Sequence, residues 1–246
     1  MNEFTSGRAL VYKSASIVER RRRILSEARK LIADVGIAGF NVRDLCARAH
    51  IAQKTLYNAF GSKENVISMA IRQYLADFMD RVAFTHDQGS VQGRLERYVK
   101  VHSRNIQIRP YTTAIMAVYN SPTADPGIRG AIREVAEAAL RPYANTVAQR
   151  RNFATGLDPE RYVQMSVTTQ YAVLTDWCVG EIPDEGLVDR MCEMFLVILE
   201  GATVGATRKE AGDWLRQVRT GGETWTALRR QAAVRPSELE PTLHAV

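Results

Sequence analysis

Apolar residues recur at three- and four-residue intervals along most of the chain, which is the spacing of one face of an α-helix. The first such stripe runs over residues 24–35 and stops at Gly36 and Gly39, because glycine favours helix ends. No run of alternating β-branched residues bounded by turns predicts a strand. We therefore expect an all-α fold.

The later apolar stripes are separated by short breaks rich in proline, glycine and serine. They predict helices over residues 62–84, 91–108, 111–120, 126–153, 159–179 and 185–206, with two shorter ones around Trp214 and Trp225. Pro126 and Pro159 suit the first turn of a helix, where the missing N–H costs nothing. The chain contains no internal repeat and no low-complexity tract.

Residues 41–66 predict two short helices joined by a tight turn. Asn41 is a good N-cap for the first helix, and Leu45 and Cys46 lie on its apolar face. After the turn at residues 50–52, Leu56 and Phe60 face inward. The outer side of the second helix is then polar and basic, which is typical of a helix that reads DNA.

This segment resembles the N-terminal helix-turn-helix of the TetR family of bacterial transcriptional regulators. The residues in register with the family pattern are Thr55, Leu56, Tyr57, Phe60, Lys63 and Glu64, and the departures are His50, Ala52, Lys54 and Ala59. His50 replaces a glycine of the turn and must adopt a backbone conformation that glycine adopts freely. Ala52 cannot cap the second helix, which costs about 1 kcal/mol relative to serine.

The resemblance implies an N-terminal three-helix DNA-binding domain followed by a helical ligand-binding and dimerisation domain. Residues 1–62 would form the DNA-binding domain with a basic N-terminal arm, and residues 63–206 a connecting helix with the effector-binding and dimerisation helices. Residues 207–246 lie outside the resemblance and have no assigned role. They could fold back on their own domain or cover the edge of a dimer.

Positive charge is concentrated in the N-terminal part of the chain. The net charge is +6, yet residues 1–63 hold 12 Lys or Arg and 5 Asp or Glu, whereas the remainder holds 21 and 22. A scattered excess would fit a solvated basic surface, but this segregated excess favours a polyanion partner. The run of four arginines at residues 20–23 can follow phosphates or enter a minor groove, or it is a solvated helix end.

By resemblance, each subunit inserts residues 53–60 into a major groove of double-stranded operator DNA. Gln53, Lys54 and Thr55 are the candidates for base contacts, because the N-terminal part of a recognition helix approaches base edges. The candidates for phosphate contacts are Arg22, Arg23, Asn41, Arg43, Tyr57, Asn58 and Lys63. A homodimer would read a palindromic operator.

The expected helix over residues 185–206 carries apolar residues around much of its circumference, which implies burial from more than one side. The resemblance implies that this helix and residues 159–179 form a four-helix bundle with a second subunit. A large core in a monomer is the alternative.

Aromatic and methionine side chains are frequent in the central region and are candidates to surround a small-molecule effector. They are Tyr98, His102, Met116, Tyr119, Tyr143, Tyr171 and Trp177. Each of them is equally compatible with ordinary core packing. Arg104 and Arg109 are candidates to meet an effector with a negative charge.

No motif for a catalytic, cofactor or metal site is visible, so we expect neither an enzyme nor a cofactor. The chain shows no secretory signal and no apolar run long enough to span a membrane, which predicts a cytoplasmic protein. A transcriptional regulator, most simply a repressor, is the leading interpretation. The alternatives are a nucleoid-type DNA-binding protein without an effector and an enzyme with a DNA-binding appendage.

Overall fold

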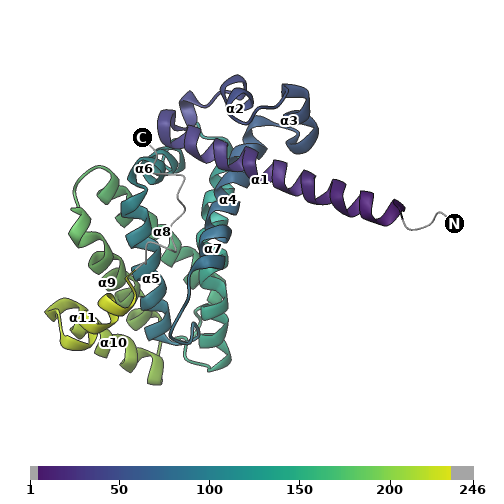
Figure 1. Ribbon diagram of the computed structural model, residues 1–246. Helices are drawn as coiled ribbons and strands as arrows, with labels where there is room; N and C mark the ends of the chain where they lie inside the picture. The colour runs from purple at the N-terminus through teal and green to yellow at the C-terminus, as the bar shows by residue number, and fades with distance from the viewer. Residues whose placement is uncertain (1–4, 234–246) are drawn as a thin grey trace.

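The computed structural model describes residues 5–233, with side chains from residue 16 onward (Figure 1). Within that range the chain forms eleven helices and no β-strand, which confirms the all-α prediction. The helices are α1 Thr5–Gly39, α2 Val42–Arg48, α3 Gln53–Phe60, α4 Lys63–Arg81, α5 Val91–Gln107, α6 Arg109–Tyr119, α7 Pro126–Gln149, α8 Pro159–Cys178, α9 Asp184–Ala202, α10 Gly205–Thr220 and α11 Glu223–Gln231. None of these helices has the length and apolar character needed to cross a membrane.

Helices α2 and α3 lie together at one end of the molecule, and α10 and α11 lie at the other (Figure 1). The first part of α1 projects away from the body, whereas its second part packs against α2, α4 and α6. Helix α4 begins next to α3 and then packs along α7. It therefore joins the N-terminal helices to the rest of the fold.

Several helix ends differ from those expected from the sequence: α4 ends at Arg81 rather than at residue 84, and α7 at Gln149 rather than at residue 153. Gly36 interrupts α1 with φ 69 and ψ 173, a conformation that only glycine adopts easily. Helix α9 ends at Ala202 rather than at residue 206, because Thr203 and Val204 are extended. The Val204 N–H donates to the Asn152 carbonyl at 2.8 Å, so the extended segment ties the α9–α10 connection to the α7–α8 loop.

Helices α10 and α11 fold back on α9 and α5 of their own subunit. The Trp225 indole Nε1–H donates to Asp189 Oδ1 at 3.0 Å, and Arg229 Nη1 donates to the same carboxylate at 3.0 Å. Asp189 lies on α9, so these bonds hold α11 against α9. The sequence predicts that α9 is unusually apolar but does not predict this contact.

The loop between α4 and α5 is held by one buried carboxylate. Glu96 is 1% exposed and accepts the backbone N–H groups of Thr85 and His86, each at 2.9 Å, with His86 Nδ1 at 3.1 Å. Burial raises the pKa of Glu96, but these hydrogen bonds outweigh it, and its pKa lies below the ordinary value.

Replacing Glu96 by glutamine is expected to destabilise the protein by about 1–3 kcal/mol at neutral pH, because buried N–H groups lose a charged acceptor. The folded-state pKa is depressed, so the contribution is complete above the unfolded pKa of about 4.3 and is lost as the pH falls through the folded value. Urea unfolding at pH 7 and at pH 4 measures both effects. Glu134→Gln is the control, since that exposed carboxylate pairs only with Arg72 on the surface.

Candidate DNA interface and effector cavity

Helix α2 begins at a side-chain cap. The Asn41 Oδ1 accepts the N–H groups of Arg43 at 2.7 Å and Asp44 at 3.1 Å, while its amide donates to the Asp44 carboxylate at 2.7 Å. The apolar faces of α2 and α3 meet through Leu45, Leu56 and Phe60, which are all buried. The Asn41 side chain is thus already bonded within the helix-turn-helix, although it remains exposed.

The turn between α2 and α3 has the geometry predicted from His50 and Ala52, two residues that depart from the family pattern. His50 has φ 50, in the left-handed region that favours glycine. Ala52 is the N-cap of α3 and makes no side-chain hydrogen bond. The first N–H groups of α3 are therefore not satisfied by a cap, and the positive end of the helix faces the surface.

Most of the α3 side chains predicted to contact DNA are exposed. Gln53, Lys54, Tyr57 and Asn58 are exposed, and Thr55 is half-buried. Outside α3, Arg22, Arg23, Asn41 and Arg43 are exposed as well. Lys63 is half-buried at the start of α4, with its Nζ 5.8 Å from the centroid of the Phe40 ring. Their contacts with DNA remain predictions.

Arg21 positions the C-terminal end of α3, a role that sequence reasoning missed. Its Nη1 donates to the Ala59 carbonyl at 2.8 Å, and its guanidinium lies 4.7 Å from the centroid of the Phe60 ring. A cation at a helix C-terminus is favourable because the last carbonyl groups are unpaired. The signal was present in the spacing, because Arg21 precedes Ile24, Leu25 and Ala28 on the inward face of α1.

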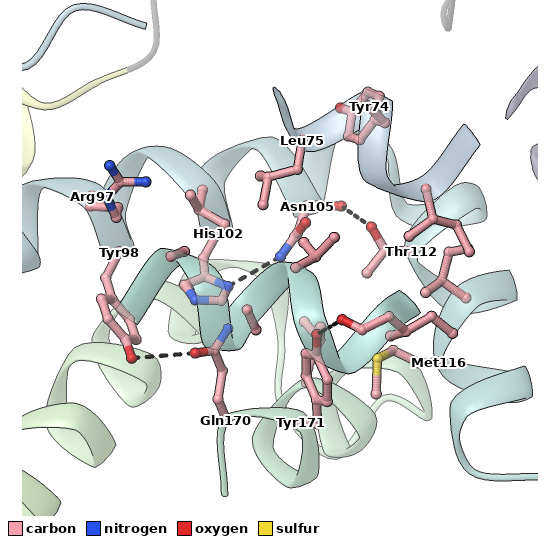
Figure 2. A pocket seen from close by; sticks show the side chains of 18 of the residues that line it. Tyr74, Leu75, Arg97, Tyr98, His102, Asn105, Thr112, Met116, Gln170 and Tyr171 are labelled. Atoms are coloured by element: carbon pink, nitrogen blue, oxygen red, sulfur yellow. Dashed lines mark hydrogen bonds between the residues drawn. The ribbon is translucent and has the colours of Figure 1, made fainter. Parts of the chain in front are cut away.

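A cavity of about 150 Å³ lies between α4, α5, α6, α7 and α8. Four of the residues predicted from the sequence line it, namely Tyr98, His102, Met116 and Tyr171, and Figure 2 shows them around the cavity. Most of the remaining lining is aliphatic, including Leu75, Ile115 and Leu174. Such a mixture of apolar walls and few polar groups suits a small, largely apolar ligand.

The other three predicted residues lie outside the cavity lining. Trp177 is buried and its Nε1–H donates to Asp184 at 2.8 Å. The Tyr143 ring packs edge-on against Phe195. The Tyr119 ring packs edge-on against Tyr171, with 4.7 Å between the ring centroids. They belong to the core and to the outer side of the cavity wall.

Two pairs of polar side chains in the cavity lining are bonded to each other. The Tyr98 hydroxyl donates to Gln170 at 3.3 Å, and His102 Nδ1 lies 3.2 Å from the Asn105 amide (Figure 2). Burial lowers the pKa of His102 to about 3, so its ring is neutral at physiological pH. The Tyr111 hydroxyl is buried and has no partner among the described residues.

The arginines near the cavity are not those expected from the sequence. Arg109 pairs with Asp184 at 2.6 Å and covers the Trp177 ring, away from the lining. Arg104 is buried outside the cavity lining, where its Nε–H donates to the Tyr74 hydroxyl. Arg94 and Arg97 line the cavity instead. Their spacing from Tyr98 and Val101 places them on one face of α5, a pattern that could have identified them.

Tyr74 connects the cavity with the N-terminal helices. This α4 residue lines the cavity, and its hydroxyl accepts Arg104 Nε–H from α5 at 2.8 Å. From α1, the Arg29 guanidinium lies 5.7 Å from the Tyr74 ring centroid, and its Nη1 is 3.6 Å from Asp77 Oδ2. A change in the cavity wall at Tyr74 therefore reaches α1 through direct contacts.

Apolar side chains are exposed on α8 and α9, at Met165 and Val197, and directly after each helix, at Val179 and Val204. Met165 is 51% exposed, Val179 69%, Val197 44% and Val204 41%. Between them lie the small or uncharged exposed residues Thr168, Thr169, Ala172 and Gly201. In contrast, Phe195 is 1% exposed and stacks on Tyr98 at 5.0 Å inside the subunit.

Comparison with known proteins agrees with this architecture. Residues 24–68 match the sequence model of the tetR family of bacterial regulatory proteins. The chain is 33% identical over 70 residues to the HTH-type transcriptional regulator BetI 1 of Chromohalobacter salexigens, a match that spans 28% of this chain and 35% of that protein.

Two solved structures show the same fold over most of the chain. The tetR regulator tylP of Streptomyces fradiae superposes with a TM-score of 0.62 at 16% identity, covering 92% of this chain and 96% of the other. The transcriptional regulator FadR of Bacillus subtilis, solved in complex with stearoyl-CoA, superposes with a TM-score of 0.55 at 18% identity, covering 73% and 98%.

Proposed function

Because this chain belongs to the TetR family of bacterial transcriptional regulators, we propose that it is a repressor released from its operator by a small apolar or amphipathic effector. The observation that carries this proposal is the position of α4. Its first turn adjoins the recognition helix α3, and further along Ile71, Tyr74 and Leu75 line the cavity. A ligand that moves this wall would tilt the helix that holds α3.

The cavity and its place in the fold support a regulatory ligand. FadR, which shares the fold, was solved with stearoyl-CoA, so this fold can hold an amphipathic ligand. A ligand can shift the DNA-binding equilibrium only by its difference in affinity for the two states, and about 1.4 kcal/mol of coupling gives tenfold release. The chromosome lies in the bacterial cytoplasm, where we expect the protein to act.

We expect the functional unit to be a homodimer joined through α8 and α9. The exposed apolar side chains Met165, Val179, Val197 and Val204, on or directly after these helices, support this arrangement, because exposed apolar surface can mark a protein–protein interface. Two copies of α3 related by two-fold symmetry would read a palindromic operator in two successive major grooves.

Selection of bound duplexes from a random-sequence pool tests the DNA-binding function. We expect one enriched palindrome and, on that operator, a loss of affinity when an effector is added. Equal binding of all sequences at moderate salt would indicate a nucleoid-type protein instead, and an operator complex that responds to no cavity ligand would contradict the regulatory mechanism.

Lys54→Ala is expected to reduce discrimination between operator and mismatched duplexes by about 1–3 kcal/mol, because Lys54 is exposed near the start of the recognition helix. Lys63→Ala should instead weaken all duplexes similarly and lower the salt dependence by about one phosphate contact. Mobility-shift titrations at several salt concentrations separate the two effects. If both variants bind the operator like the wild type, the proposed contacts are wrong.

A further inference from the structure

Two arginines that line the cavity, Arg94 and Arg97, have no carboxylate partner among the described residues. Arg94 is 4% exposed. Its Nη1 donates to the Ala139 carbonyl at 2.9 Å, and its buried Nε has no hydrogen-bond partner in that part of the chain. The Arg94 guanidinium carbon also lies 5.8 Å from the centroid of the Tyr143 ring. A cation–π contact of this kind stabilises a buried charge only weakly.

Arg97 lies one turn further along the same face of α5. Its Nε donates to Gln88 Oε1 at 3.1 Å, its Nη1 lies 3.5 Å from the Met79 sulfur, and its guanidinium lies 4.8 Å from the Phe84 ring centroid. All these partners are neutral. Burial and the neighbouring Arg94 charge lower the pKa of Arg97 to about 10.

Buried charges in proteins are ordinarily paired, because an uncompensated charge in a poorly solvated site is costly. Other buried charges follow that rule only in part: Glu96 accepts several N–H groups and Arg29 lies beside Asp77, whereas buried Arg104 has the neutral partners Tyr74 and Gln107. Arg94 and Arg97 differ from Arg104 because they line the cavity, where a bound anion can reach them.

We propose that the cavity binds an anionic amphiphile whose carboxylate or phosphate head group lies between Arg94 and Arg97. This inference rests on the proposed function, since it takes the cavity to be the effector site. The apolar body would extend toward Ile115, Met116 and Leu174. Figure 2 shows Arg97 at the opposite end of the labelled side chains from Met116, which gives the ligand its orientation.

The cavity dimensions limit the apolar body. An apolar cavity of about 150 Å³ accommodates a body the size of a benzene ring. His102 is neutral and the remaining polar groups are uncharged, so only the arginine end distinguishes an anion from a neutral molecule of the same shape. Charge-assisted hydrogen bonds to two guanidinium groups are stronger than neutral ones, which provides that distinction.

Calorimetric titration with matched probes tests the inference. The probes are 3-phenylpropionate and octanoate, the amides of both, octylamine and octyl phosphate. We expect each carboxylate to bind at least about tenfold more tightly than its amide, and octylamine not to bind. Comparison of octanoate with octyl phosphate determines which head group fits better, and either preference is consistent with the inference.

Arginine variants show whether this end of the cavity provides the preference. Arg97→Gln and Arg94→Gln should each reduce carboxylate affinity by about tenfold while leaving amide affinity nearly unchanged. Arg97 is only partly buried, so its variant remains informative if Arg94→Gln fails to fold. Arg133→Gln is the matched control, because Arg133 pairs with Glu137 outside the cavity lining.

Equal affinity for acid and amide, an arginine-independent preference, or no binding of either carboxylate or of octyl phosphate would overturn the inference. These outcomes leave open regulation by a neutral ligand, so the proposed function would stand. Conversely, arginine-dependent carboxylate binding that never changes operator affinity would support the inference and contradict effector-controlled release.

Discussion

Val197→Asp is expected to give a folded monomer that binds its operator at least about a hundredfold more weakly than the wild type. Val197 is 44% exposed on α9, so its side chain is not needed to fill the core of one subunit. In the proposed dimer the same position would be covered from both subunits, and an unpaired charge there is costly. Sedimentation equilibrium measures the assembly, and a mobility-shift titration measures the affinity.

A variant at Phe195, two residues before Val197, distinguishes a loss of folding from a loss of assembly. Phe195→Asp places a carboxylate in the core against Tyr98 and should cost more than about 4 kcal/mol, so we expect an unfolded chain. Val197→Thr, which keeps shape without charge, should remain dimeric. A wild-type protein that sediments as a monomer at micromolar concentration, or a dimeric Val197→Asp variant, would show that α8 and α9 do not join the subunits.

Tyr74→Phe is expected to remove most of the effect of the ligand on operator affinity, an effect that typically amounts to about 5–150-fold in regulated proteins. The change deletes the hydroxyl that accepts Arg104 Nε–H at 2.8 Å but keeps the ring in the cavity wall and beneath Arg29. Ligand binding and DNA binding measured separately should therefore persist, whereas their mutual influence should fall toward none. Operator titrations with and without ligand measure this effect of the ligand on operator affinity directly.

Tyr98→Phe is the matched control for this loss of coupling. Tyr98 also lines the cavity, but its hydroxyl joins α5 to Gln170 on α8, whereas the Tyr74 hydroxyl joins α4 to α5. Its replacement should alter ligand affinity and leave the coupling intact. If Tyr74→Phe keeps the full ligand effect, the path from the cavity to the recognition helix does not run through this hydroxyl.

The helix-turn-helix could be predicted closely because its constraints are local. A cap at Asn41, a turn that forces His50 into a left-handed conformation and inward residues at Leu56 and Phe60 all act within a few positions of each other. The missing cap at Ala52 was also visible in the sequence. Local hydrogen bonding and sterics determine these features, so no distant contact can change them much.

The cavity could be predicted only in part, because core and cavity wall use the same residue types. Met116 and Trp177 are both buried apolar side chains, yet Met116 faces the cavity and Trp177 bonds to Asp184. Arg94 and Arg97 were missed because an arginine on a helix is usually at the surface. Only the packing of α4, α7 and α8 around α5 reveals that these guanidinium groups lie inside.

The apolar excess of α9 shows that three different environments can produce one sequence pattern. Part of that excess contacts α10, which folds back from beyond the region of family resemblance. Part is turned into the subunit, as at Phe195, and part is exposed, as at Val197. Counting apolar residues along the helix cannot separate these environments.

The unpaired Arg94 and Arg97 charges also have a consequence for protein turnover. An anion that binds only the native state raises its stability by about 2.7 kcal/mol at a hundred times its dissociation constant. Proteases in the cell remove chains mainly when they unfold, so ligand-bound copies should survive longer and accumulate. A persistent signal would thus release the promoters and enlarge the pool of regulator at the same time. When the signal disappears, that larger pool would shut the promoters quickly, without waiting for new synthesis.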